Sequence, residues 1–285
     1  MSQTNRKTRY SADETGKSPL YHLSYIIKEF PASHELGLRL FKRNLKAAYR
    51  QSALGFAWAL IPPFITAILW IFLQKNGVMQ INSDGPSYPL FVITGTILWQ
   101  IVSESVWAPI NALSGNRSII SKINIPREGL LLSSIYELVF NMIIKALILI
   151  VILIVFNSNI SILGLIAASI GAIGLALVGF SIGLLLTPIS LLYGDVQRGI
   201  GVILPFIMYI SPVVYSTPTS GRMGALMQLN PLNTIIPFTR NCILHVPTGP
   251  VFWFWCVLLM FILIFIFCII YFRISMPMVI ERIGN

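Results

Sequence analysis

The sequence is poor in charged residues. Asp, Glu, Lys and Arg make up 11% of its 285 residues, and hydrophobic residues make up 55%. Soluble globular domains contain roughly 25% charged residues. No charged residue occurs between Lys145 and Asp195. This composition excludes an ordinary soluble domain and predicts an integral membrane protein.

The sequence also has few residues that carry chemistry. The three cysteines form no CxxC pair and the three histidines are scattered, which argues against a disulfide framework and a zinc site. No Ser, His and acid set is apparent, and no complete phosphate-binding loop is present. Residues 1–18 are polar and lack the apolar core of a signal peptide, so we expect no cleaved leader. We therefore expect no enzyme and no cofactor bound by this chain.

Apolar runs are the dominant pattern, because a helix that crosses the hydrocarbon needs roughly 20 mostly apolar residues. The uncharged stretch 146–194 would be about 73 Å long as one helix, so we expect a turn at Asn157–Asn159. Pro205 and Pro212 interrupt the fifth run. The prediction is an all-α membrane protein with six transmembrane helices, at residues 57–73, 90–110, 129–156, 160–186, 199–216 and 251–272.

The distribution of Lys and Arg gives the orientation. With six spans, the segments on the side of the termini hold 16 of these residues and the opposite loops hold 3. The positive-inside rule then places both termini in the cytoplasm. The net charge of +10 indicates anionic lipid rather than nucleic acid as a neighbour. An alternative with five spans, in which the fifth run only dips into the membrane, would place the C-terminus outside.

The N-terminal region divides at about residue 34. Residues 1–34 form a polar segment, and residues 35–285 form the transmembrane domain. Between Glu35 and Arg50, apolar residues and basic residues fall on different faces of a helix, which predicts an amphipathic helix in the membrane interface. An ordinary positively charged flank explains the charges equally well. The two faces hold Leu38, Phe41, Leu45 and Ala48, and Arg39, Lys42, Arg43, Lys46 and Arg50.

Two loops have sequence patterns that suggest more than a connection between spans. Gly115 and Pro126 bound a short segment whose isoleucines suit docking on a soluble partner, or a plain connector in the interface. The segment 215–250 is too long for a plain hairpin and contains two moderately apolar stretches, 223–229 and 234–244. These favour re-entrant helices between spans five and six, or an external amphipathic loop.

Three ionisable residues, Glu104, Glu137 and Lys145, fall inside the predicted spans. Such groups are costly in the membrane and usually functional, unless they reach the interface. Lys145 lies deepest, so it either lines a path or pairs with a carboxylate or with carbonyls. Gly179 and Gly183 have the GxxxG spacing that allows close helix contact.

Six segments in order, from about residue 39 to 245, resemble the ABC-2 type permeases that export cell-surface polysaccharides, the O-antigen, capsule and teichoic acid exporters. No single segment is specific to this family, but all six in this order make the resemblance specific. They are Arg43–Trp58, Tyr88–Gln100 with Gly95 and Trp99, the loop Gly115–Arg127, Tyr193–Val196, Ser211–Tyr215 and Leu229–Leu232.

The resemblance implies a homodimer in the bacterial cytoplasmic membrane, carried on two separate ATP-binding subunits that hold ATP and Mg. A lipid-linked polysaccharide would pass between the two permease copies, and re-entrant helices at 217–247 would surround the external mouth. An ABC-2 permease for a drug or small lipid is the alternative; a secondary transporter is disfavoured because the halves show no repeat. The implied ATPase-coupling residues are Arg117, Ile119, Ile120, Lys122, Ile123, Arg127, Asp195 and Arg198. The predicted channel-lining residues are Phe64, Tyr209, Tyr215 and Lys145.

Overall fold

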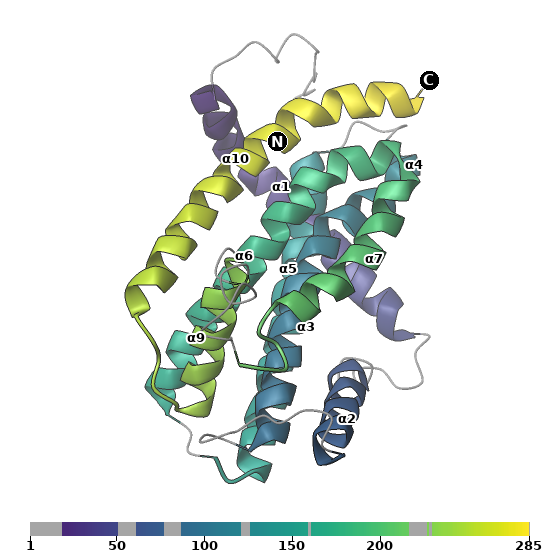
Figure 1. The fold of residues 1–285 in the computed structure, drawn as a ribbon. Coiled ribbons are helices and arrows are strands. Elements are labelled where there is room, and N and C mark those ends of the chain that lie inside the picture. The colour runs from purple at the N-terminus through teal and green to yellow at the C-terminus, as the bar shows by residue number, and fades with distance from the viewer. Residues whose placement is uncertain are drawn as a thin grey trace.

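The computed structural model describes residues 19–50, 61–76, 87–120, 126–158, 161–216, 227 and 230–284. This part of the chain consists of helices and turns and contains no strand, which confirms the all-α prediction (Figure 1). The helices are α1 (Pro19–Arg50), α2 (Ile61–Lys75), α3 (Tyr88–Ser114), α4 (Arg117–Ile120), α5 (Arg127–Val155), α6 (Ile162–Leu192), α7 (Gly194–Ile210), α9 (Leu232–Leu244) and α10 (Val251–Gly284).

Four of these helices, α3, α5, α6 and α10, are long and apolar enough to cross a membrane. They correspond to the second, third, fourth and sixth predicted spans. The helices at the first and fifth spans, α2 and α7, have 15 and 17 residues, and residues 57–60 of the first span lie outside the described ranges. Six crossings therefore remain a prediction.

The fifth predicted span differs from α7 at both ends. The helix begins at Gly194 rather than 199, and Pro205 lies inside it without ending it. It ends instead at Ile210, where Ser211 takes an extended conformation with ψ of 148°. Ser211 precedes Pro212, and the ring of a proline disfavours the helical conformation of the residue before it. Residues 211–216 are thus a turn and not the end of a span.

The turn within the long uncharged stretch is where the sequence predicted it. Helix α5 ends at Val155, and Asn157 adopts a left-handed conformation with φ of 50°, which asparagine tolerates better than most residues. The next helix starts after Ser161, whose side chain accepts a hydrogen bond from the Gly164 amide. An N-cap of this kind satisfies one of the free amides at a helix start. Asn159 lies outside the described residues.

Helix α3 forms the centre of the bundle, and α6 packs against it through glycines. A side chain at Gly179 or Gly183 would meet the backbone carbonyls of Val102 and Val106, respectively. The GxxxG spacing is therefore a close helix contact in this structure. Nearer the start of α6, Gly171 lies against Thr239 of α9. The glycines thus bring α6 close to two neighbours.

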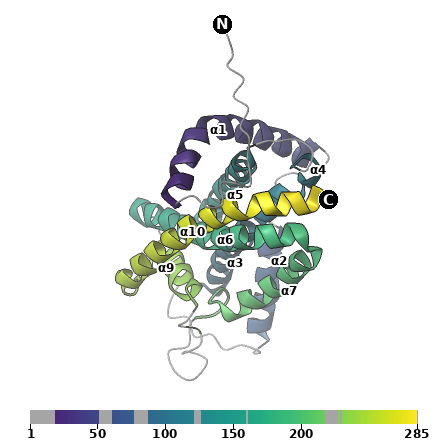
Figure 2. The same ribbon diagram turned by 90° about the horizontal axis from the view of Figure 1, so that it is seen from above.

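At one end of the bundle the last part of α10 crosses over α6, and α1 wraps around the flank beside α5 (Figures 1 and 2). Helix α10 continues twelve residues past the predicted end of span six at Phe272, and its last part bends across this end towards α4. Arg273 allows the extension, because its guanidinium lies 3.4 Å from Glu128 at the start of α5. Helix α1 lies along α5 and begins at Pro19, earlier than predicted. Its helical character is confirmed, and its position in a membrane interface remains a prediction.

Polar contacts fix α1 to α5. The His34 ring nitrogen Nδ1 lies 2.6 Å from the Tyr136 hydroxyl, and Asn44 donates a hydrogen bond of 2.8 Å to Glu137. Phe41 packs edge-on against the Tyr136 ring. Glu137 therefore has a partner in α1, which explains how a carboxyl is held within a predicted span.

Candidate functional site

Those of the predicted coupling residues that the structure describes lie at the end of the bundle that the last part of α10 crosses (Figure 1). Arg117 and Ile120 are in α4, together with Ile119, and Arg127 begins α5. Ile120 is buried, and it borders a small space with Arg117, Leu191 of α6, and Ile280 and Ile283 of α10. Lys122 and Ile123 lie outside the described residues.

The second predicted contact starts α7. Asp195 and Arg198 form an exposed ion pair of 3.0 Å in its first turn, only a few residues after α6 ends at Leu192. Since Leu191 also borders the space beneath α4, the two segments that the resemblance assigns to coupling lie at the same end of the molecule. The structure adds a third element to them, the last part of α10.

At the other half of the bundle, a buried arginine joins three segments. Arg240 of α9 is 2% exposed and donates hydrogen bonds to the carbonyls of Pro212, at 2.9 Å, and Val213. Its guanidinium carbon lies 3.8 Å from the centre of the Phe91 ring in α3, a favourable position for a cation. An arginine side chain stays protonated in proteins, so Arg240 places a cation between these segments.

The segments around Arg240 are ones that carry the family resemblance. The Tyr88 hydroxyl donates to the Val214 carbonyl at 3.2 Å, and Asn230 donates to the Ser211 hydroxyl at 3.0 Å. A side chain at Gly95 would collide with Val213 and Arg240, so only glycine permits this approach. The motifs at 88–95, 211–215 and 230–232, far apart in the sequence, thus form one contact region, which we call the Arg240 node.

The role of Arg240 was not predicted from the sequence, where Arg240 is one of the three basic residues assigned to the loops opposite the termini. The usable signal was its position in the moderately apolar stretch 234–244. Arginine is almost never fully buried unless it is paired. Its partners are backbone carbonyls 27 and 28 residues earlier, and no local pattern marks them.

Lys145 of α5 forms an ion pair with Glu104 of α3. The ammonium nitrogen lies 2.5 Å from the carboxylate oxygen, and the two side chains are 3% and 39% exposed, respectively. Of the two interpretations of Lys145, the structure thus shows the pairing with a carboxylate. Its lining of a transport path remains a prediction.

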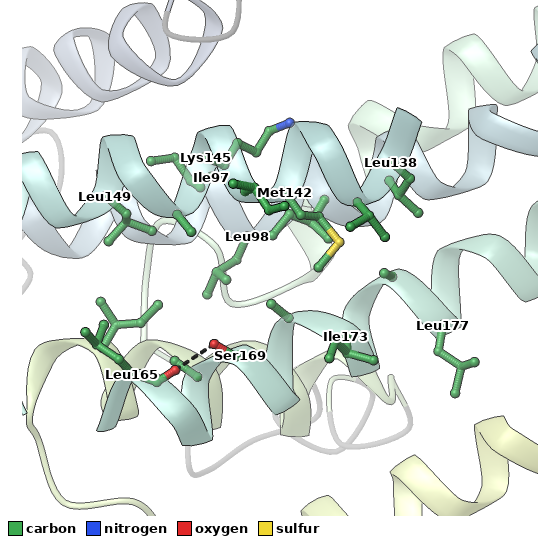
Figure 3. A pocket seen from close by; sticks show the side chains of 18 of the residues that line it. Ile97, Leu98, Leu138, Met142, Lys145, Leu149, Leu165, Ser169, Ile173 and Leu177 are labelled. Atoms are coloured by element: carbon green, nitrogen blue, oxygen red, sulfur yellow. Dashed lines mark hydrogen bonds between the residues drawn. The ribbon is translucent and has the colours of Figure 1, made fainter. Parts of the chain in front are cut away.

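The Lys145 side chain also borders an apolar groove of about 510 Å³ between α5 and α6, with α3 as its floor. Figure 3 shows Leu138, Met142 and Leu149 on one side and Leu165, Ile173 and Leu177 on the other, while the Lys145 nitrogen points away from α6. Ser169 satisfies its hydroxyl within its own helix, on the Leu165 carbonyl. A groove with this lining holds hydrocarbon better than water.

Of the other predicted channel-lining residues, Tyr209 and Tyr215 lie close together. The Tyr215 hydroxyl donates to the Tyr209 carbonyl at 2.7 Å, and the Tyr209 ring lies 6.4 Å from Trp70 of α2. Phe64, also on α2, is exposed, as is Tyr209. Tyr209 and Tyr215 therefore lie together beside α2, with Trp70 as a neighbour that the sequence did not indicate. Within the described residues, no cluster of His, Cys, Asp and Glu suits a metal ion.

Comparison with known proteins finds relatives that align along most of the chain. The O-antigen export system permease protein RfbA of Klebsiella pneumoniae is 25% identical over 226 residues, which are 79% of this chain and 83% of the relative. A second protein of that name from the same organism is 24% identical over 226 residues. The RfbA of Myxococcus xanthus is 24% identical over 216 residues, 74% of this chain and 81% of the relative. No family model matches the chain.

Proposed function

We propose that this chain, a member of the ABC-2 type permeases that export cell-surface polysaccharides, is the membrane subunit of an exporter for an O-antigen-like polysaccharide. The observation that carries the proposal is the alignment with O-antigen export permeases over about four fifths of both chains. The chain does not hydrolyse ATP in this proposal. A separate ATPase subunit binds ATP and Mg, and two permease copies form the passage for a lipid-linked glycan.

The end of the bundle that holds α4 is the proposed docking surface for the ATPase subunits. Helix α4, the first turn of α7 and the last part of α10 lie there together. Arg117, Asp195 and Arg198 are exposed on it. This end is then the cytoplasmic one, and α1 and the C-terminal end of α10 are on it, as the distribution of basic residues predicts.

At the opposite end, α9 fits the proposal of a re-entrant helix. It runs antiparallel to the first half of α6, with Ile235 near Gly174, Thr239 near Gly171 and Cys242 near Gly164. Because α6 spans the membrane in this proposal, α9 lies at membrane depth, and the turn at 211–216 lies beside it. Polar backbone at that depth must be satisfied by protein, and Arg240 supplies hydrogen bonds to two carbonyls of the turn.

The proposal is tested in a strain that lacks this chain and retains its ATPase partner. We expect the wild-type chain to restore surface polysaccharide and to co-purify with the ATPase subunit. Arg117→Glu in α4 should leave the chain in the membrane but abolish export, because it reverses a charge on the docking surface. Arg282→Glu, near the exposed end of α10, probes the third element in the same assay.

Two results would contradict the proposal. ATP hydrolysis by the purified chain alone would make it an enzyme rather than a permease subunit. Full export by Arg117→Glu, at wild-type amounts of protein, would remove α4 from the coupling surface.

A further inference from the structure

Helix α3 is mostly buried, but in its second half one stripe is open and polar. Gln100, Ser103, Glu104, Trp107 and Asn111 are all partly or fully exposed, and their spacing places them on one face of a helix. Val102, Ser105, Val106 and Pro109, on the other side, pack against the glycines of α6. We call the five exposed residues the polar stripe of α3.

Lipid-facing surfaces of this molecule have a different composition. The exposed positions in the middle of α5 include Val139, Ile143, Leu147 and Val151. On α6, Ile166, Ile173, Ile182 and Leu185 are exposed, and the one exposed serine there, Ser169, uses its hydroxyl within the helix. Polar side chains at membrane depth face protein or water, because exposure to hydrocarbon is costly. The polar stripe is therefore not a lipid-facing surface.

The chemistry of the stripe suits an uncharged polar ligand. The charge of Glu104 is balanced by Lys145, so the stripe carries no net charge. The Gln100 side-chain oxygen is buried and has no hydrogen-bond partner within the described part of the chain. Amide and hydroxyl groups offer both donors and acceptors, and the Trp107 ring offers an apolar face with a polar edge. A hydrated ligand rich in hydroxyl groups matches this set.

We propose that the polar stripe of α3 lines the water-filled inner part of the passage and contacts the hydroxyl groups of a neutral glycan. This inference rests on the proposed function and identifies a wall of the passage distinct from Phe64, Tyr209 and Tyr215. Ser103 contacts the glycan from a position beside Gln100, and the Glu104–Lys145 pair keeps the wall free of net charge.

The test is the reaction of single cysteines with a permanently charged methanethiosulfonate reagent. The full chain, assembled with its ATPase partner in native membranes, carries Cys242→Ser, Cys256→Ser and Cys268→Ser as background. Gln100→Cys and Ser103→Cys are the test positions, and Lys75→Cys, exposed at the end of α2, serves as the accessible control. The reagent reacts with thiolate in water, so we expect the test positions to react at least ten times faster than lipid-facing cysteines.

The lipid-facing controls are Ile143→Cys and Ile182→Cys, which match the test positions in depth. Ile143 lies two residues before Lys145, which pairs with Glu104, and Ile182 precedes Gly183, which packs at Val106. No reaction at residues 100 and 103, or equal reaction at all four positions, would overturn the proposal. Spontaneous disulfide-linked dimers of Ser103→Cys would also overturn it, because the stripe would then be a packed interface.

Export provides the second measurement. Ser103→Leu and Gln100→Leu remove polar groups from the wall, so we expect at least a fivefold loss of export with unchanged assembly with the ATPase partner. Normal export by both variants would overturn the role in glycan passage. Thiol labelling requires no transport, so failure of the proposed function and failure of this inference give different results.

Discussion

Because α6 lies so close to α3, we predict that a single methyl group added at the contact destabilises the protein. In Gly183→Ala, the new methyl would meet the Val106 carbonyl and lie 2.7 Å from the Pro109 ring. Both belong to a helix at the centre of the bundle, so neither can turn aside as a flexible side chain would. Gly199 of α7 is the matched control, because no heavy atom lies within 4 Å of a methyl built there.

The magnitudes follow from two opposing effects. Alanine is more favourable than glycine inside a helix by about 0.5–1 kcal/mol, and this gain applies to both variants. Overpacking of a filled interior costs about 1–3 kcal/mol, and this cost applies to Gly183→Ala only. The free energies of unfolding of the two variants should therefore differ by about 1–3 kcal/mol, with Gly199→Ala the more stable.

Thermal unfolding of the purified chain in detergent measures this difference. Gly199→Ala should melt at or above the wild-type temperature, and Gly183→Ala several degrees below Gly199→Ala. Gly179→Ala should follow Gly183→Ala, since a methyl there would meet the Val102 carbonyl. If Gly183→Ala melts at the temperature of Gly199→Ala, the close packing of α6 on α3 is wrong.

Three further predictions concern other contacts. Glu104→Gln leaves the buried Lys145 ammonium without a carboxylate and should lower the melting temperature, with a loss of stability approaching the about 3–5 kcal/mol of a broken buried pair. Lys145→Met should cost less, because water reaches Glu104. The double variant should be more stable than Glu104→Gln alone, whereas additive losses from the two single changes would contradict the pairing. Arg240→Met should lower the free energy of unfolding by at least about 2 kcal/mol, since two carbonyls lose their donor at about 1–3 kcal/mol each. Arg240→Lys should recover only part of this loss, because lysine lacks the forked guanidinium of arginine. A wild-type melting temperature for Arg240→Met would refute the Arg240 node. Ile280→Asp should place a charge beneath α4 and uncouple ATP hydrolysis from export in the assembled complex. Met278→Asp, on the exposed side of α10, is the control and should leave the coupling intact. Equal effects of the two variants would show that the α10 contact with α4 is unimportant.

Local patterns predicted the features that depend on neighbouring residues. The turn at Asn157 was predicted from the polar run Asn157–Asn159, whose side chains favour local backbone hydrogen bonds over a continued helix, and Asn157 has the left-handed backbone that asparagine tolerates. The end of α7 at Ile210 lies six residues before the predicted end of the fifth span. Pro212 was recognised as an interruption, but the end of the span followed the apolar run rather than the effect of Pro212 on Ser211. A similar limit applies to α10, where Arg273 suggested the end of the last helix.

Features that depend on distant partners could not be predicted in this way. Arg273 stays in the helix because Glu128 lies beside it, 145 positions away in the chain. The partner of Lys145 was left open between a carboxylate and carbonyls, since nothing in α5 indicates that Glu104 of α3 faces it. The polar stripe of α3 was likewise visible only as Glu104, because its other members are significant only once burial separates them from the packed face.

The Arg240 node has a consequence for the order in which the protein assembles during synthesis. The chain is made from the N-terminus, so α3 and the turn at 211–214 emerge before Arg240 does. An arginine cation enters the apolar layer at a high cost unless its partners are already there, and all of its partners precede it: the Phe91 ring and the carbonyls of Pro212 and Val213. Helix α9 therefore packs in place only after α3 and this turn are present, which makes the Arg240 node one of the last contacts of the bundle to form.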